Sequence, residues 1–261
     1  MQNQQPSTLK EIRVHGTQDF PCAFYQTGTR IKGNMVKHHW HEEVELLYFS
    51  GGEFCLEVNM ERFNISEECF YVINPGELHS ISVEKNGGCV ENAVVFHMDM
   101  LNSAYALDQI QTNLIQPVQN GSIQFPRCLR KNEPAFEPVR KSYEEIRNVF
   151  GGDSFRENYY DGEAVTDDIT RQLFIKSALL RILAVLSANN LFEVTEKNHD
   201  HRIETIKTTL TYIQENYKEK IYIRDLAGLI GMNEQYFCRF FKKVIGRSPM
   251  EYVNEYRIKK A

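Results

Sequence analysis

The sequence predicts an α+β protein with a β-rich front and a helical end. Between residues 12 and 100, short apolar runs alternate with glycine-containing turns, which is typical of a barrel or sandwich of short strands. After residue 136, apolar side chains recur at helical spacing. The charge also changes along the chain. Residues 202–261 hold 12 Lys and Arg against 7 Asp and Glu, whereas the remaining residues hold 18 against 28.

The overall composition is that of a globular protein with two domains of ordinary size. The chain has 261 residues, of which 42% are hydrophobic and 25% charged. A net charge of −5 argues against a protein that coats nucleic acid over its whole surface, but a basic end on an acidic body is expected when one domain alone meets an anion. The 6 cysteines form no CxxC pair, and the N-terminus lacks the apolar stretch of a signal peptide. We therefore expect reduced thiols and a cytoplasmic protein without a membrane segment.

Residues 1–135 are predicted to form the barrel. Runs such as CAFYQT, EVELLYF, EFCLEV and CFYVI supply strands, and the pairs Gly51-Gly52 and Pro75-Gly76 supply turns between them. Many short strands at regular spacing favour closure into a small barrel.

Residues 136–192 are predicted to be helical, and the longest helix covers 167–187. Side chains such as Ile169, Leu173 and Leu183 make it apolar on most of its surface, so it must be buried on more than one side. One side can cover the barrel. The other side either packs in the same core or meets a twin across a two-fold axis, and the sequence leaves both interpretations open.

The end of the chain is predicted to be a bundle of short helices. Residues 193–201 are polar and read as a linker, and residues 202–261 follow as the last domain. Its first helix carries an amphipathic stripe that includes Ile206 and Leu210. A second helix covers about 223–230, and the turn GMN leads into a third helix.

The third helix has a core face and a polar face. Phe237, Phe240, Phe241 and Val244 stand at i, i+3, i+4 and i+7 and therefore face the other helices. Asn233 can cap the helix through the free N–H groups of its first turn. The aromatic side chains of this segment are thus mostly core residues.

The polar face of the third helix is suited to DNA. Two short helices joined by a tight glycine-containing turn, the second with a polar and basic outer face, form a helix-turn-helix arrangement. An α-helix fits the major groove, where Gln pairs with adenine and Arg with guanine, while flanking cations hold phosphates. A plain helical bundle with a solvated charged face fits the same periodicity. The predicted DNA contacts are Asn233, Glu234, Gln235, Cys238, Arg239, Lys242, Lys243 and Arg247.

The segment IRDLAGLIGMNEQYFCRFFKKVIGRSPMEYVNEYRIKKA resembles the first helix-turn-helix of the AraC/XylS family of transcription regulators. The resemblance implies that Gln235, Cys238 and Arg239 face the groove. Two residues depart from the family pattern, because Tyr222 stands where a Ser or Thr cap is usual and Cys238 stands at a polar reading position. The matching residues are Leu226-Ala227, Gly231-Met232, Tyr236-Phe237, Arg239, Phe241-Lys242, Gly246, Ser248-Pro249, Tyr252, Arg257-Ile258 and Ala261.

The family has two helix-turn-helix units joined by a long helix, and this sequence ends where that helix begins. Residues 248–261 match its start, with Pro249 in the first turn. We expect either a truncated chain or a protein that works with one reading helix. A single unit covers little DNA and binds weakly, and a dimer would restore two reading helices.

Two segments of the front domain resemble cupin motifs. GNMVKHHWHEEVELLYFSGG at residues 33–52 is similar to the first motif, and NPGELHS at residues 74–80 is similar to part of the second. If residues 39, 41 and 45 lie on one strand they point to one side, and residue 79 would join them from a facing strand. Asn74 stands where a Pro is usual, and Val83 where an Asn is usual. The expected pocket is formed by His39, His41, Glu45 and His79.

This pocket has two candidate uses. Three histidines and a glutamate suit zinc, iron or manganese. Without a metal, the same side chains can hydrogen-bond a sugar or another small polar ligand. The resemblance implies that such regulators commonly keep the pattern in a metal-free sensing domain. We therefore predict ligand binding and no cofactor, with a divalent metal at these four residues as the alternative.

The sequence as a whole predicts a cytoplasmic, ligand-responsive, sequence-specific DNA-binding transcription regulator that is not an enzyme. Its expected partners are DNA, a small-molecule effector and a second copy that meets helix 167–187. One alternative is a metal-dependent cupin enzyme. Another is a remnant of a regulator that no longer binds DNA and acts as an interaction protein.

Overall fold

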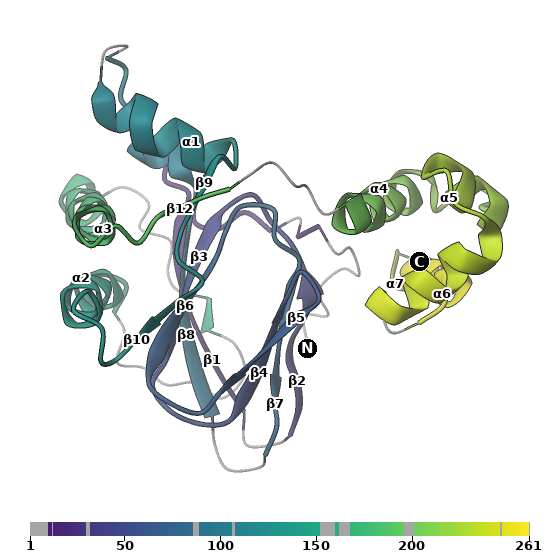
Figure 1. Cartoon of the computed structure of the whole chain (residues 1–261), viewed down its shortest axis with the longest axis horizontal. Helices are drawn as coiled ribbons and strands as arrows, with labels where there is room; N and C mark the ends of the chain where they lie inside the picture. Colours follow the sequence, from purple (N-terminus) through teal and green to yellow (C-terminus); the bar gives the residue numbers. More distant parts are fainter. Residues whose placement is uncertain are drawn as a thin grey trace. The chain divides into compact units, whose positions relative to one another are not determined.

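The computed structural model describes residues 10–260, apart from residues 12, 30–31, 86–88, 106–107, 152–159, 162–167, 196–200 and 246. The described residues form two compact units. The larger unit contains residues 13–37 and 42–197, and the smaller contains residues 10–12, 38–41 and 198–261. Figure 1 shows a β-barrel with attached helices in the first part of the chain and a group of helices, α4 to α7, at its end.

The barrel is made of a six-stranded sheet and a four-stranded sheet. Their strand orders are β10-β6-β3-β8-β1-β11 and β2-β7-β4-β5. The strands are β1 Cys22–Thr29, β2 Gly33–His39, β3 Val44–Phe49, β4 Phe54–Val58, β5 Glu61–Ile65, β6 Cys69–Ile73, β7 His79–Val83, β8 Cys89–Phe96, β10 Cys128–Arg130 and β11 Tyr160–Asp161. The predicted barrel of short strands is confirmed.

Alternation along the strands divides the apolar side chains between two cores. On β3, Leu47 and Phe49 pack between the two sheets together with Phe54 and Leu56 of β4. The intervening Leu46 points to the other face of its sheet, where it joins a core shared with the helices. This division follows from the two-residue period of a strand.

Two helices cover the outer face of the six-stranded sheet. α2 (Phe136–Val149) and α3 (Ile169–Ala188) lie side by side there (Figure 1). Tyr143 and Leu179 belong to the core between these helices and the sheet. The Asp168 carboxylate caps α3 by accepting from the Thr170 N–H at 2.9 Å.

Helix α3 is apolar on two sides, and the described residues of the larger unit cover one of them. Its residues Ile175, Leu179 and Leu183 are buried in the core. In contrast, 72% of Ile169 and 62% of Leu173 remain exposed. The predicted helix 167–187 therefore does cover the barrel, and its outer stripe has no cover within this unit; residue 167 lies outside the described residues.

Short elements connect the barrel to the helices. They are a 3-10 helix Met98–Leu101, a π-helical turn Gln111–Ile115, α1 Gln116–Gln119, and the strands β9 Ile123–Gln124 and β12 Glu193–Val194, which pair with each other. The predicted linker 193–201 thus begins as a strand of the larger unit. Residues 196–200 lie outside the described part of the chain.

The smaller unit is mainly helical. α4 (His201–Asn216), α5 (Ile223–Leu229), α6 (Glu234–Ile245) and α7 (Pro249–Lys260) follow in sequence. The predicted core faces meet: Ile206, Leu210, Ile213, Leu226, Phe237 and Phe241 are all almost completely buried. Among the residues that the structure describes, no helix combines the length and the apolarity that crossing a membrane would require.

Candidate functional site

The turn between α5 and α6 sets the angle between the two helices. Gly231 adopts a φ of 63°, in the left-handed region that glycine enters without a steric penalty. The Met232 N–H donates to the Ala227 carbonyl at 3.0 Å, which closes the end of α5. This geometry fits the predicted helix-turn-helix.

Side chains cap both helices of the pair. The Asn233 Oδ1 accepts from the Tyr236 N–H at 2.8 Å and caps α6, as predicted. At α5, the Asp225 carboxylate accepts from the Tyr222 N–H at 3.2 Å. The family pattern has a Ser or Thr as the N-cap of this helix, where this chain has Tyr222. Asp225 therefore supplies part of the capping of α5.

The inner face of α6 is fixed by aromatic packing. Phe237 and Phe241 are both 0% exposed and meet edge to face, with ring centroids 5.6 Å apart. Phe241 also contacts Tyr252 of α7, at 5.9 Å. Such packing holds one helix face inward, so the opposite face is held outward.

The outer face of α6 carries most of the predicted DNA contacts. Glutamine, arginine and lysine side chains there are exposed, and the cations gather in the last turn and beyond. Cys238 differs, because it is half-buried, and burial next to Glu234 raises the pKa of its thiol. The exposed predicted residues are Asn233, Glu234, Gln235, Arg239, Lys242, Lys243 and Arg247.

Tyr236 is a surface residue that matches the family pattern but was not among the predicted DNA contacts. Its side chain is 49% exposed, and its ring lies parallel to that of Phe240 at 6.5 Å. The signal was available, because Tyr236 lies one turn before Phe240 yet falls outside the core stripe. An exposed aromatic ring beside Gln235 adds an apolar contact surface to this face.

Two of the four predicted pocket residues, Glu45 and His79, lie in the larger unit and pair with each other. The other two, His39 and His41, fall in the smaller unit, where their ring centroids are 5.6 Å apart. His41 and His79 are only 3% and 1% exposed. The assignment of all four residues to one ligand pocket stays a prediction.

The strands that carry the cluster differ from the prediction. His39 ends β2 and Glu45 lies on β3, so residues 39, 41 and 45 do not share one strand. β2 and β7 are neighbours in the four-stranded sheet, and β3 belongs to the other sheet. The facing residue is thus Glu45 and not His79. The chain changes sheets between residues 41 and 44, which period-two counting cannot detect.

Hydrogen bonds fix the orientation of the His79 ring. Its Nδ1 lies 2.9 Å from the Glu77 carbonyl oxygen, which can only accept, so Nδ1 carries the proton. Its Nε2 points to Glu45 Oε2 at 2.9 Å. This directs Nε2 towards Glu45, an orientation that also suits a ligand hydrogen bond or metal coordination.

The loop before His79 is anchored by a buried carboxylate. Glu77 Oε2 accepts from the Asn74 N–H at 2.8 Å and from Arg127 Nη1 at 2.7 Å. Its Oε1 accepts from Asn59 Nδ2 at 3.2 Å and from Arg127 Nη2. Asn74 in turn accepts the Phe125 N–H through Oδ1 at 2.8 Å. A proline at position 74 would have neither the N–H that donates to Glu77 nor the side-chain oxygen that accepts from Phe125. These two hydrogen bonds explain why Asn74 stands where the cupin motif usually has a Pro.

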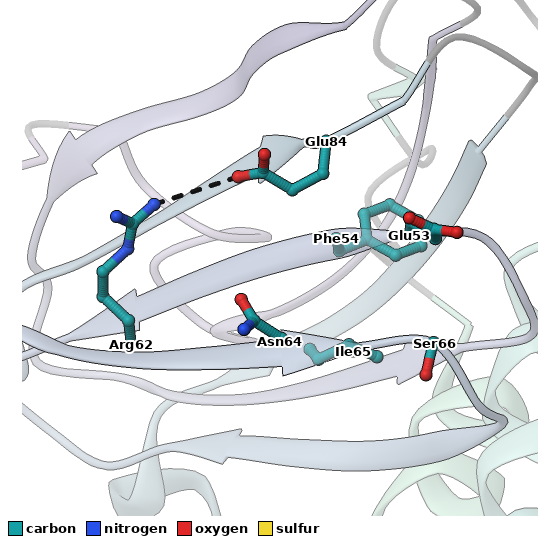
Figure 2. A pocket seen from close by; sticks show the side chains of 7 residues that line it. All are labelled: Glu53, Phe54, Arg62, Asn64, Ile65, Ser66 and Glu84. Atoms are coloured by element: carbon teal, nitrogen blue, oxygen red, sulfur yellow. Dashed lines mark ion pairs between the residues drawn. The ribbon is translucent and has the colours of Figure 1, made fainter.

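A separate surface depression lies on β4 and β5. Figure 2 shows its polar lining, with Arg62 and Glu84 3.8 Å apart. It has a volume of about 490 Å³ and is open to solvent. Its lining does not include the histidine cluster, and it consists of Glu53, Phe54, Arg62, Asn64, Ile65, Ser66 and Glu84.

Known families match both parts of the chain. Residues 213–254 match the bacterial regulatory helix-turn-helix proteins of the AraC family, and residues 27–148 match the AraC-like ligand-binding domain. The fold and these matches define a DNA-binding regulator with a ligand-binding domain. The chain belongs to the AraC family.

Individual proteins show more distant similarity. An uncharacterized HTH-type transcriptional regulator, YdeC of Bacillus subtilis, is 26% identical over 97% of this chain and 81% of its own length. The melibiose operon regulatory protein of Escherichia coli is 23% identical over 86% of this chain and 69% of its own length. A structure of wild-type ToxT from Vibrio cholerae with bound unsaturated fatty acid is 10% identical, covers 94% of this chain and 80% of that chain, and has a TM-score of 0.37.

Proposed function

We propose that the protein is a sequence-specific transcription regulator of the cytoplasm whose DNA affinity responds to a small polar molecule in the barrel. The supporting observation is the outer face of α6, where Gln235 and Arg239 are exposed above a fully buried aromatic face. In this proposal the two side chains read bases, and Lys242, Lys243 and Arg247 hold phosphates. The role is regulatory and not catalytic.

The effector site of this proposal is the cluster of His39, His41, Glu45 and His79. A sugar suits such a set, because its hydroxyl groups both donate to carboxylates and accept from imidazole N–H groups. Effector binding would favour one relation between the two domains and so change the population that fits the DNA.

The DNA-reading claim is tested by salt and sequence dependence. Preferred sites are first selected from random duplexes with the full chain, and affinities are then measured by fluorescence anisotropy between low and physiological salt. Lys242→Ala should weaken binding to all DNA sequences alike, and it should reduce the slope of log affinity against log salt concentration by about 1. Arg239→Ala should relax preference at one base pair and cost about 1–3 kcal/mol there. Lys141→Ala, an exposed lysine on α2, is the matched control and should change neither.

The effector claim needs its own experiment. A panel of sugars and polar metabolites is titrated by calorimetry into wild type and His79→Ala. Any binder is then added to the DNA assay. Identical DNA affinity with and without every binder would remove the switching part of the proposal and leave DNA reading intact.

We further propose that two copies associate through α3. Ile169, Leu173 and Leu180 form an exposed apolar stripe on this helix, and a two-fold axis lets the same stripe cover its twin. Leu173→Glu should therefore yield a monomer in sedimentation experiments, whereas the exposed Glu193→Ala should not. A monomeric wild type at micromolar concentration would contradict the dimer.

A metal-dependent role is the second candidate, favoured by the orientation of His79. A histidine whose Nδ1–H donates to a backbone carbonyl presents Nε2 as metal-ligating residues do. The donor set fits zinc, iron or manganese. Metal analysis of purified protein separates the candidates, because stoichiometric metal that is lost in His41→Ala would favour this one.

A further inference from the structure

Two cysteines lie on neighbouring strands of the barrel. In the antiparallel pair of β6 and β10, Cys128 lies opposite Tyr71 and Arg130 lies opposite Cys69. Residues two apart on a strand share a face, so Cys69, Tyr71 and Cys128 point to the same side. The two cysteines are therefore diagonal neighbours across the strand pair, and a disulfide between them requires a small shift of β10, because diagonal positions are wider apart than directly opposite ones.

The two thiols differ in exposure. β10 is the terminal strand of its sheet, and Cys128 is half-buried there. Cys69 is 6% exposed and belongs to the core between the sheets. The Tyr71 ring packs against Phe63 at 5.6 Å and closes the inner side. A small solute can reach Cys128, whereas Cys69 lies behind it.

Their surroundings also separate their acidities. The neighbouring Cys69 and Tyr71 side chains, with the charge of Arg130, lower the pKa of Cys128 to about 7 against the opposing effect of burial. The same contact with Cys128, together with burial, raises the pKa of Cys69. Near neutral pH, Cys128 is thus partly a thiolate, and Cys69 keeps its proton.

We propose that Cys128 and Cys69 form a peroxide-reactive dithiol, with Cys128 as the attacking sulfur and Cys69 as the resolving sulfur. The Cys128 thiolate attacks a hydroperoxide oxygen, the O–O bond breaks, and Cys128 becomes a sulfenic acid while the peroxide leaves as an alcohol or water. Cys69 then attacks the Cys128 sulfur and expels water. Two electrons pass from two thiols to one peroxide, and a disulfide joins β6 to β10. A cellular thiol reverses the step.

The expected rate advantage follows from the acidity. At pH 7, a thiol of pKa about 7 is about half thiolate, whereas one at the ordinary value of 9.0 is about one-hundredth thiolate, a ratio of about fifty. The lower basicity reduces intrinsic nucleophilicity by about eightfold. Cys128 should therefore react roughly six times faster than an unperturbed cysteine at pH 7. The advantage should vanish at about pH 8, and above pH 9 the more basic thiol should react faster.

The test uses the reduced full chain with hydrogen peroxide at pH 7. Trypsin cleaves after Lys85 and after Arg127, so a Cys69–Cys128 bond appears as a linked pair of peptides, 63–85 with 128–130, that reduction separates. Cys69→Ser should trap the Cys128 sulfenic acid, which dimedone labels. Cys128→Ser should abolish the linked peptide. Cys238, another half-buried thiol, is the internal control, and Cys238→Ser should form the bond at the wild-type rate.

Several results would overturn the proposal. Slower oxidation of Cys128 than of Cys238 at pH 7 would contradict the acidity argument. A disulfide between two copies, or no linked peptide in wild type after Cys128 has reacted, would contradict the resolving role of Cys69. Because the wild-type peptide map decides these points, a Cys69→Ser variant that fails to fold leaves the test intact.

Discussion

Replacing Glu77 by alanine should destabilise the barrel more than any exposed ion pair can. The Glu77 carboxylate is 8% exposed and accepts hydrogen bonds from Asn59, Asn74 and Arg127. Removing one partner of a buried ion pair costs about 3–5 kcal/mol, because the other charge is left without compensation. The Arg127 side chain is 26% exposed and water can solvate it partly, so we expect about 3 kcal/mol.

Urea unfolding followed by circular dichroism measures this loss, and thermal unfolding should show a fall in Tm of roughly 6–12 °C. Glu77→Gln keeps one acceptor oxygen and should lose about half as much. The double variant with Arg127→Met should recover stability relative to Glu77→Ala, since no guanidinium is then stranded. Glu53→Ala is the matched control: its ion pair with Lys85 is exposed and contributes below about 1 kcal/mol. If Glu77→Ala and Glu53→Ala unfold at the same urea concentration, the anchoring role of Glu77 is wrong.

Three further perturbations test other parts of the structure. Phe237→Ala removes a fully buried ring and should lower the free energy of unfolding by about 3–5 kcal/mol. In a urea titration, the C-terminal helices of this variant should unfold before the barrel, and a single transition identical to that of wild type would contradict the packing described. Asn233→Ala removes the α6 cap and should cost about 1 kcal/mol, with Asn233→Asp retaining stability as the comparison. Burial and the nearby Glu45 raise the pKa of Glu91 well above 4.5. The contribution of Glu91 to folding stability is therefore fully present below pH 4.5 and is lost as the pH rises, at no more than about 1.4 kcal/mol per pH unit. Glu91→Gln should reduce this dependence of stability on pH and be more stable than wild type at pH 7, and a steeper pH dependence in the variant would refute the assignment.

The helical end of the chain was readable from the sequence because its signals are local. Phe237 and Phe241 repeat at helical spacing, and the cap at Asn233 lies three residues from its partner. Strand positions were likewise marked by short apolar runs. Which strands pair is a long-range property, however, and no spacing rule reports it.

The histidine cluster shows this difference within one site. The role of its members stays a prediction, and the expectation that Glu45 shares a strand with His39 and His41 was wrong, because the change of sheet after His41 leaves no periodic signal. Glu77 and Arg127 were missed altogether. They are 50 residues apart, and only the folded barrel brings them into contact.

Glu234 is the first residue of α6, and in the proposed DNA complex its negative charge would have opposite effects on the helix and on the DNA. The carboxylate stabilises the positive N-terminal end of the helix, yet it repels the sugar-phosphate chains on both sides of a groove. Only a base that offers a hydrogen, such as the amino group of cytosine, compensates for that repulsion. If α6 reads DNA as proposed, its acidic tip would hold random duplexes weakly, and its selectivity would arise as much from the sequences that it rejects as from those that it accepts.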